Sequence, residues 1–325
     1  MSSLKACIFI LTQNTPERKI YLKTTLYFLF QNFNSKYKYP LRILHEGDYD
    51  ATSQEEIIKS VRSSMRHLVT FKELDKTDFD IPEHINLEKV NKSIEIQPVP
   101  YWRNLKYRSM CYFWIKHFFK YTKEFDYVMR LDDDSFIEEP IAEDFFKILE
   151  HKNLVYISNI VHVDCGLCNF QMKELFERIA PDKKEMLNGI FVSSVLGPDN
   201  PIFHKFKKVH SLITDKEIIQ NEYKLDMPYM YYNNFFITRT AFWNQEDVKK
   251  IIEEIDKDGG IFYYRYGDAP LQTLILSILA PSQISKAKFK YSKRLQREVF
   301  IDQDKNFHSY MPNTYNKSSC MLEEA

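Results

Sequence analysis

Glycine is scarce in this chain of 325 residues, with only 7 glycines against 25 phenylalanines and 21 tyrosines. Neither G-x-G-x-x-G nor G-x-x-x-x-G-K-[ST] is present, which excludes the glycine-rich phosphate loops of dinucleotide-binding and P-loop proteins. An excess of either charge is also missing, because Lys and Arg total 45 and Asp and Glu total 45. A neutral chain is not expected to bind nucleic acid through bulk electrostatics.

Long apolar runs and complete cysteine motifs are absent as well. No apolar stretch reaches the roughly 18 residues of a transmembrane helix, and no signal peptide precedes the first strand. As written, the chain is expected to be soluble and cytoplasmic. Cys165 and Cys168 form a C-x-x-C that no second pair completes into a zinc site, so two ordinary thiols are expected there.

The most informative segment that is present is a short apolar strand, Tyr127–Leu131, which runs into Asp132, Asp133 and Asp134. If strand geometry persists, Asp132 and Asp134 point the same way, about 7 Å apart along the backbone. Such a pair suits a hard divalent cation or a diphosphate carried on one, and is the Asp-x-Asp arrangement of nucleotide-sugar glycosyltransferases. An acidic turn without metal is the alternative. Arg130, just before the cluster, is expected to pair with a carboxylate.

Strands and helices alternate along the chain, which predicts a doubly wound α/β sheet in one domain. Residues 76–100 are expected to be irregular, and 181–230 are expected to wrap the sheet. The predicted strands are 6–11, 41–44, 68–71, 127–132 and 154–159, and the predicted helices are 15–33, 53–62, 104–121, 141–150, 169–180, 241–256 and 269–279.

A second informative block is Asp258–Pro270. Gly259 and Gly260 permit a sharp turn after a helix, and Gly267 permits close approach of the backbone to a ligand. Asp268 is predicted at the N-cap of the last strong helix, where a carboxylate satisfies unpaired N–H groups. A cap with no further role is the alternative to a functional carboxylate.

These segments resemble glycosyltransferase family 15, the α-1,2-mannosyltransferases that modify fungal glycans. Residues 107–113 are similar to the family's Tyr-Arg-x-Met-Cys-Arg-Phe helix, and 127–136 correspond to its strand ending in Glu-Pro-Asp-Val. Residues 258–270 are close to its Gly-Gly-Phe-Tyr-Tyr-Glu-Arg-Trp-Gly-Asp-Ala-Pro block. The resemblance extends from near residue 6 to about residue 280.

The resemblance implies a GT-A type nucleotide-diphosphate-sugar transferase fold with a mixed, mostly parallel sheet flanked by helices. It implies one catalytic domain over 1–325, with a nucleotide-binding half at 6–135 and an acceptor-binding half plus C-terminal tail at 136–325. The implied reaction is Mn²⁺-dependent transfer of mannose from GDP-mannose to a sugar hydroxyl of a glycan or glycoprotein, with retention. It also implies the Golgi lumen as the compartment if the chain has been trimmed.

Carried over residue by residue, the resemblance also implies a set of site residues. Asp132 and Asp134 take the metal-binding positions, with His308 as a further metal ligand or else a surface histidine. Asp268 is the implied catalytic carboxylate. The implied donor- or acceptor-binding residues are Tyr107, Arg108, Asn234, Tyr264 and Gly267, of which Arg108 suits a diphosphate because a guanidinium matches phosphate geometry.

One departure from the family bears on catalysis. The family has Glu where this chain has Phe236, and a phenyl ring cannot attack an anomeric carbon. Front-face attack without a protein nucleophile, recruitment of Asp226 or Glu222, and a catalytically inactive sugar-binding protein all remain open. A UDP-sugar donor is a further alternative, because residues 101–106 are basic where the family carries an acid. The basic tail at 286–297 is read as a solvated face, a membrane-surface patch or a diphosphate lid.

Overall fold

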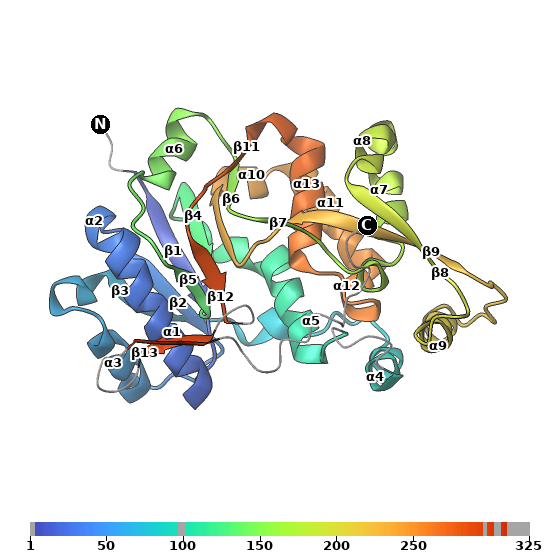
Figure 1. The fold of residues 1–325 in the computed structure, drawn as a ribbon, viewed down its shortest axis with the longest axis horizontal. Coiled ribbons are helices and arrows are strands. Elements are labelled where there is room, and N and C mark those ends of the chain that lie inside the picture. The colour runs from blue at the N-terminus through green and yellow to red at the C-terminus, as the bar shows by residue number, and fades with distance from the viewer. Residues whose placement is uncertain (1–3, 97–101, 295–297, 302–306, 311–325) are drawn as a thin grey trace.

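A seven-stranded sheet forms the centre of the computed structural model, in the order β11-β6-β10-β4-β1-β2-β3 (Figure 1). The structure describes residues 4–96, 102–294, 298–301 and 307–310, and the side chains of those up to 294. β10 runs antiparallel to both neighbours, and the other pairs are parallel. The sheet is therefore mixed and mostly parallel, as predicted. Its strands are β1 (Ala6–Leu11), β2 (Leu41–His45), β3 (Val69–Glu73), β4 (Tyr127–Leu131), β6 (Tyr156–Ser158), β10 (Phe235–Arg239) and β11 (Ile284–Lys286).

Alternation along β1 divides its side chains between two cores, because successive strand residues face opposite sides of a sheet. Ile8 and Ile10 join one apolar cluster with residues of α1, α3 and α6. Cys7 and Phe9 join the other with residues of α5, α11 and α13. Both faces of the sheet are thus covered by helices, which explains the continuous apolar runs of its central strands.

Thirteen α-helices are described, and side-chain caps begin several of them. Thr15 accepts a hydrogen bond from the Arg18 amide at the start of α1, and Asn104 accepts one from the Tyr107 amide at the start of α5. The helices are α1 (Pro16–Leu29), α2 (Ser35–Tyr37), α3 (Ala51–Ser60), α4 (Leu87–Ile96), α5 (Leu105–Tyr112), α6 (Phe145–His151), α7 (Met172–Ile179), α8 (Lys184–Asn188), α9 (Phe203–Thr214), α10 (Thr240–Trp243), α11 (Glu246–Asp258), α12 (Gly260–Tyr263) and α13 (Asp268–Leu279).

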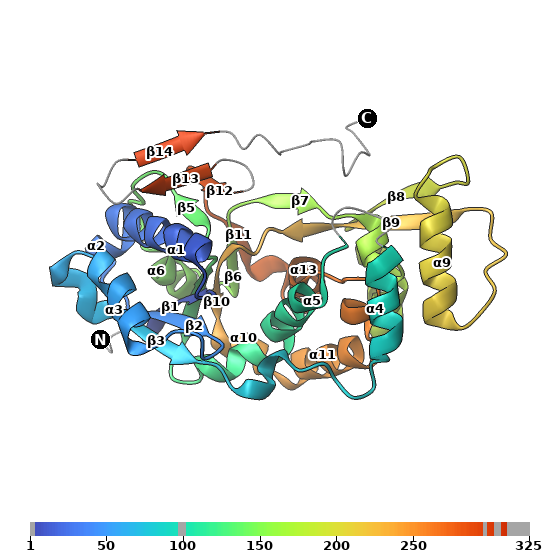
Figure 2. The same cartoon turned by 90° about the horizontal axis from the view of Figure 1, so that it is seen from below.

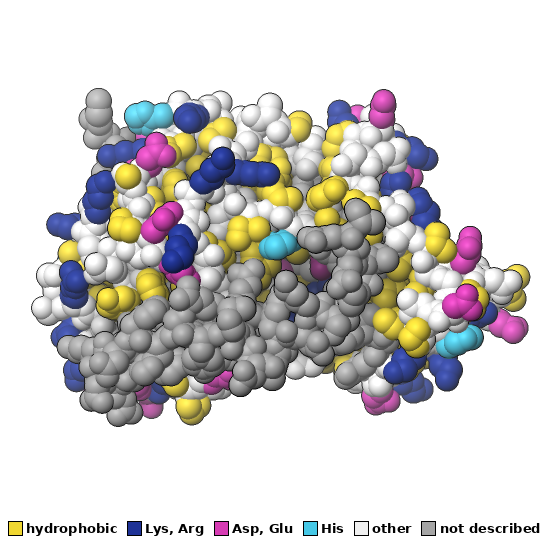
Figure 3. All heavy atoms as spheres, viewed as in Figure 1, with side chains coloured by type: hydrophobic (Ala, Val, Ile, Leu, Met, Phe, Trp, Pro, Cys, Tyr) yellow, Lys and Arg dark blue, Asp and Glu magenta, His cyan; other side chains and the backbone are white. Residues whose placement is uncertain are grey.

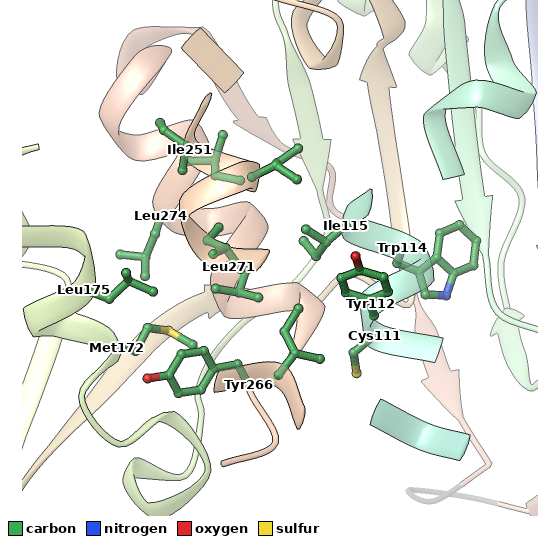
Figure 4. Close-up of a cluster of buried hydrophobic side chains, with 14 of the residues drawn as sticks. Cys111, Tyr112, Trp114, Ile115, Met172, Leu175, Ile251, Tyr266, Leu271 and Leu274 are labelled. Atoms are coloured by element: carbon green, nitrogen blue, oxygen red, sulfur yellow. The ribbon is translucent and has the colours of Figure 1, made fainter. Parts of the chain in front are cut away.

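The larger core joins α13 to elements distant in sequence. Leu271 and Leu274 of α13 lie between the side chains of α7 on one side and those of α5 on the other (Figure 4). Ile251 of α11 closes the cluster. Because α13 carries Asp268 at its first turn, this packing fixes the position of the predicted catalytic carboxylate.

Three small sheets complete the described chain. β5 (Ser135–Ile137) pairs with β12 (Tyr291–Lys293), and β13 (Glu298–Ile301) pairs with β14 (Phe307–Tyr310). β7 (Val161–Val163) and β8 (Phe191–Leu196) both pair with β9 (Tyr223–Tyr231).

Two local expectations were wrong. The segment 181–230 does not wrap the seven-stranded sheet: β8, β9 and α9 lie at the end of the molecule opposite α2 and α3 (Figures 1 and 2). The stretch 76–100 is not irregular throughout, because α4 forms within it and buries Val90 and Ser93.

The seven-stranded sheet takes strands from both of the predicted halves of the chain, which meet at residue 135. On the face shown in Figure 3, acidic and basic side chains are interspersed over the coloured surface. Within the part of the chain that the structure describes, no helix has the length and apolar character needed to cross a bilayer.

Candidate functional site

The three aspartates form a turn between β4 and β5. The Ser135 amide donates to the Asp132 carbonyl oxygen at 3.2 Å, so the chain reverses directly after Leu131. Strand geometry therefore does not persist to Asp134, and the condition under which alternation along a strand would point Asp132 and Asp134 the same way is not met. The turn follows the carboxyl end of β4, next to that of β1, which is where ligands bind in open α/β sheets.

Asp132 is held on both carboxylate oxygens. Oδ1 accepts a hydrogen bond from Arg130 Nε at 3.0 Å, and Oδ2 accepts bonds from the Asn234 side-chain amide and from Lys293 Nζ at 2.8 Å. Burial opposes ionisation of Asp132, but Arg130 and Lys293 outweigh it and lower its pKa well below the ordinary range. Asp132 is therefore a firmly ionised carboxylate, and each of its two oxygens accepts at least one hydrogen bond.

Asp133 and Asp134 are tied to the first strand-helix unit. Asp133 accepts hydrogen bonds from Thr12 Oγ1 at 2.7 Å and from Arg18 Nη1 at 2.8 Å, and Arg18 Nη1 also lies 3.4 Å from Asp134 Oδ2. Burial raises the pKa of Asp133 to about 7 against the opposing charge of Arg18, and neighbouring Asp134 adds to the rise.

Lys293 lies between two of the predicted metal ligands. Its Nζ is 2.8 Å from Asp132 Oδ2 and 3.3 Å from Asp134 Oδ1, and only 11% of its side chain is exposed. Burial disfavours the charged ammonium, but the two carboxylates prevail and raise its pKa well above the usual value. From the sequence, residue 293 was expected to be part of a basic tail, and no local pattern indicated its contact with the two carboxylates.

Arg130 joins the acidic turn to the 258–270 block. Its Nη1 donates to Asp268 Oδ2 at 2.5 Å while its Nε donates to Asp132, and its guanidinium lies 3.8 Å from the ring centroid of Trp114. The prediction that Arg130 pairs with a carboxylate is confirmed. One buried cation thus connects the two segments that the sequence singled out.

Asp268 is the first residue of α13, not its N-cap. Gly267 occupies the cap position, and no side chain caps the helix. The Asp268 carboxylate instead accepts hydrogen bonds from Arg130 and from Asn233 Nδ2, the latter at 2.8 Å. The reading of Asp268 as a simple cap is therefore wrong, because its carboxylate faces the acidic turn.

The glycines of the 258–270 block have distinct roles. Gly259 ends α11 with a φ of +70°, as the predicted sharp turn requires. A Cβ on Gly260 would lie 2.0 Å from the Tyr266 ring, and one on Gly267 would lie 3.1 Å from Pro270 Cδ and 3.6 Å from Asp164 Oδ2. Gly267 thus permits close packing at the start of α13 beside a carboxylate.

Three of the predicted binding residues are largely internal. Tyr264 is buried, with its ring against Phe170. Arg108 is fully buried and donates to the carbonyl oxygens of Phe262 and Trp102. Tyr107 is half-buried, with its hydroxyl 3.5 Å from Arg265 Nη1. In this arrangement Arg108 anchors the 258–270 block and presents no guanidinium surface to a diphosphate.

Asp164 and Arg265 lie in the same region and were not predicted. Arg265 Nη2 is 3.5 Å from Asp164 Oδ2, which also accepts a hydrogen bond from Asn169 Nδ2. Arg265 has a φ of +71°, a conformation rare outside glycine. The position of Arg265 within the 258–270 block was the only feature of the sequence that could have indicated that it belongs to this region.

The position of the family's Glu is apolar here. Phe236 is fully buried in β10, and its ring stacks on Tyr156 with centroids 5.2 Å apart. Asp226 was considered as a substitute for the family's Glu and lies in β9. Its carboxylate accepts a hydrogen bond from Ser193 Oγ and lies 3.3 Å from Lys224 Nζ. Glu222 is exposed just before β9.

The predicted metal site is incomplete in the described residues. His308 lies in β14, and its side chain is outside the described part of the chain. Among the described side chains, no group of three or more His, Cys, Asp or Glu residues is arranged to hold a metal ion. The oxygens of Asp132 and Asp134 face protein cations, so the side chains that the structure describes do not fit a divalent ion at this position.

A hollow of about 750 Å³ lies elsewhere on the described surface, between α7, α11 and the end of α13. Its lining mixes acidic, basic and apolar side chains and includes none of the predicted site residues. The acidic turn and the hollow are therefore separate features.

Comparison with known protein families gives one match across most of the chain. A sequence model of the family described as glycolipid 2-alpha-mannosyltransferase matches residues 1–293. Glycolipid 2-alpha-mannosyltransferase 2 of Candida albicans is 23% identical over 255 residues, 77% of this chain and 50% of that protein. O-glycoside alpha-1,2-mannosyltransferase omh1 of Schizosaccharomyces pombe is 23% identical over 257 residues, 78% and 59% of the two chains. The chain thus spans about half of the length of the curated relatives it matches.

Two solved structures share the fold. Core-mannan synthase A of Aspergillus fumigatus, in a Mn/GDP form, aligns with a TM-score of 0.70 and 19% identity over 90% of this chain and 75% of that one. The mannosyltransferase Ktr4p of S. cerevisiae in complex with GDP gives 0.69 and 17% over 89% and 71%. The fold is therefore of the GT-A type, as the sequence resemblance implied.

Proposed function

Because the chain belongs to the glycolipid 2-alpha-mannosyltransferase family, we propose that it transfers mannose from GDP-mannose to a hydroxyl group of a glycan, with retention. One observation carries the proposal beyond the family: Arg130 holds Asp132 of the acidic turn and Asp268 of the second block on one buried guanidinium. Arg130 and Asp268 are 138 residues apart in sequence, and their contact joins the two motifs into a single charged site at the carboxyl ends of the strands.

The donor side of this site is the acidic turn with the basic groups around it. Arg18 and Arg294 are the more exposed of these, with 36% and 27% of their side chains accessible. A guanidinium matches the geometry of phosphate oxygens, so these two side chains are the candidates for the donor diphosphate. Both solved relatives contain GDP, which supports a guanosine diphosphate donor for this chain.

The acceptor side is assigned to Asp268 and its neighbours. The carboxylate of Asp268 is oriented by Arg130 and Asn233, and a carboxylate held in this way can accept a proton from an attacking sugar hydroxyl. Tyr107, Gly267 and Asn234 remain the proposed binding residues around it. Since residue 236 is an apolar phenylalanine, the proposal assigns no protein nucleophile and takes front-face attack as the route to retention.

Mn²⁺ remains the ion that the family resemblance implies, with Asp132, Asp134 and His308 as its predicted ligands. An ion of this kind would act as a Lewis acid at a leaving diphosphate. No step of the present proposal passes through a metal, because the described carboxylates are engaged by basic side chains.

Donor turnover tests the proposed function. Hydrolysis and transfer from GDP-mannose are compared with UDP-glucose and UDP-galactose, each with Mn²⁺ and with EDTA. Asp268→Asn should lower turnover of GDP-mannose by at least about 100-fold, because the proton acceptor is lost. The matched control is Asp247→Asn on the exposed side of α11, which should leave turnover unchanged. Preference for a UDP-sugar would contradict the proposal that GDP-mannose is the donor. Binding of GDP without turnover of any donor would contradict the proposal that the chain is an active transferase.

A further inference from the structure

The short strand β12 brings a lysine into the acidic turn. β12 pairs antiparallel with β5, and this register sets Lys293 opposite Ser135, the residue directly after Asp134. The strand is anchored by the Tyr291 hydroxyl, which lies 2.8 Å from Ser135 Oγ, and by the Arg294 amide, which donates to the Asp134 carbonyl oxygen at 3.1 Å. The position of the lysine is therefore built into the backbone pairing.

The Lys293 ammonium occupies the space between the two carboxylates predicted to bind a metal. It lies 2.8 Å from Asp132 Oδ2 and 3.3 Å from Asp134 Oδ1. A divalent ion bound to those same oxygens would lie next to the ammonium, and like charges at such separation repel strongly in a partly buried site. Lysine and metal are therefore alternatives at this position.

The remaining oxygens of the two carboxylates are also engaged. Asp132 Oδ1 accepts from Arg130, and Asp134 Oδ2 lies 3.4 Å from Arg18 Nη1 and 4.0 Å from Arg294 Nε. Among the described side chains, every carboxylate of the cluster has a basic partner. The carboxylates are Asp132, Asp133, Asp134 and Asp268, and the basic partners are Arg18, Arg130, Lys293 and Arg294.

We propose that Lys293 takes the place of the divalent cation at this edge, so that the chain binds the nucleoside diphosphate of its donor without a metal. The assignment of the diphosphate to this edge rests on the proposed function. The exclusion of a divalent ion does not rest on the proposed function, because it is argued from the contacts of Lys293 and the neighbouring arginines with Asp132 and Asp134. The related Aspergillus protein was solved in a Mn/GDP form. In this chain, by contrast, the positive charge at this position would come from a lysine side chain and not from a metal ion.

Metal binding in the absence of nucleotide gives the first test, by titration of Mn²⁺ against the full chain with electron paramagnetic resonance. The native protein should show no saturable site below about 1 mM, the upper range of weak carboxylate sites. Lys293→Ala should bind Mn²⁺ at least about tenfold more tightly, about 1.4 kcal/mol, because the two carboxylates lose their shared ammonium. Lys290→Ala removes the same charge from an exposed lysine and should behave as the native chain.

Nucleotide binding gives the second test, by calorimetric titration of GDP with EDTA or with Mn²⁺. EDTA should change the affinity of the native chain less than about twofold, and Lys293→Arg, which keeps a cation, should behave the same way. Lys293→Ala should bind GDP only with Mn²⁺ present. A tenfold loss of native GDP affinity in EDTA, or native Mn²⁺ binding as tight as that of Lys293→Ala, would overturn the proposal.

Failure of the proposed function is distinguishable from failure of this inference. If the native chain binds no GDP under either condition, the donor assignment is wrong, yet the Mn²⁺ titration still decides whether Lys293 excludes the ion. If Lys293→Ala does not fold by circular dichroism, the native chain and Lys293→Arg in EDTA still decide the question.

Discussion

Arg130 is the residue on which the charged site depends. It is 2% exposed, its guanidinium contacts Asp132, Asp268 and the face of Trp114, and no lysine could make these planar contacts together. Burying a charge is tolerable only when it is paired, so the arginine and its two aspartates are energetically one unit.

Replacing Arg130 by methionine should therefore lower the free energy of unfolding by about 3–5 kcal/mol, because two carboxylates are left without their shared cation. Urea denaturation followed by circular dichroism measures the effect. The control is Arg178→Met, which removes a guanidinium with 65% of its side chain exposed from Asp258 and should change stability by less than about 0.5 kcal/mol. Equal losses in the two variants would show that the Arg130 pairing contributes no more than a surface ion pair.

Within single elements, the tightest local constraint is the turn between α11 and α12. A Cβ at Gly260 would stand 2.0 Å from the ring of Tyr266, whose hydroxyl donates to the Phe170 carbonyl oxygen at 2.6 Å. The ring is 1% exposed and therefore has no room to move aside.

Gly260→Ala should destabilise the fold by about 1–3 kcal/mol through overpacking. Gly197→Ala is the matched control, because a Cβ there meets no atom within 4 Å, and its expected effect is under about 0.5 kcal/mol. Thermal unfolding of both variants beside the native chain measures the difference. A Gly260→Ala protein as stable as Gly197→Ala would mean that Tyr266 leaves its pocket without cost.

Helices and strands whose own residues carry a recognisable pattern could mostly be predicted from the sequence, and those without such a pattern could not. The start of α1 follows from Thr15 and Pro16, and β1 follows from an unbroken apolar run, because caps and buried strands leave marks on adjacent residues. α4 was missed although Leu87, Val90 and Ile94 have helical spacing, because the segment 76–100 as a whole is polar and contains prolines. β9 contains Pro228, and its buried and exposed residues do not alternate regularly. The sequence around β9 therefore does not predict that it pairs with β7 and β8.

At the scale of the molecule, buried histidines make stability depend on pH. Burial lowers the pKa of His45 and His210, which are buried, and of His117, which is half-buried. An unfolded histidine titrates near pH 6.5, so below that value the unfolded chain takes up protons that the folded chain resists. The stabilisation is therefore present above about pH 6.5 and is lost as the pH falls through the lowered folded values.

Through these histidines, urea unfolding should show lower stability at pH 5 than at pH 8, a difference that Asp133, with its pKa raised to about 7, acts against. His210→Phe should reduce that difference, because His210 is packed among the rings of Phe170, Phe206 and Tyr223 and a phenyl ring cannot take up a proton. His204→Phe changes an exposed histidine of the same helix and should leave the difference as it is. An unchanged pH difference in His210→Phe would assign the acid sensitivity to other groups.

The site itself was predictable only in its acidic and glycine-containing segments. The motifs around Asp132, Asp134 and Asp268 indicated these carboxylates as site residues. Several of the basic side chains that pair with them lie far away along the chain. Lys293 meets Asp132 across 161 residues, and Arg18 meets Asp133 across 115. Contacts of that range are decided by sheet order and register, which no local pattern encodes.

The late position of β12 in the chain also bears on how the protein is made. A ribosome releases the acidic turn about 160 residues before it releases Lys293, at the usual order from N- to C-terminus. Until β12 docks on β5, Asp132 and Asp134 lack the ammonium that they share in the finished fold. Before that point Arg130 and Arg18 are the basic partners available to Asp132 and Asp134, and the acidic turn reaches its final charge only when β12 has docked.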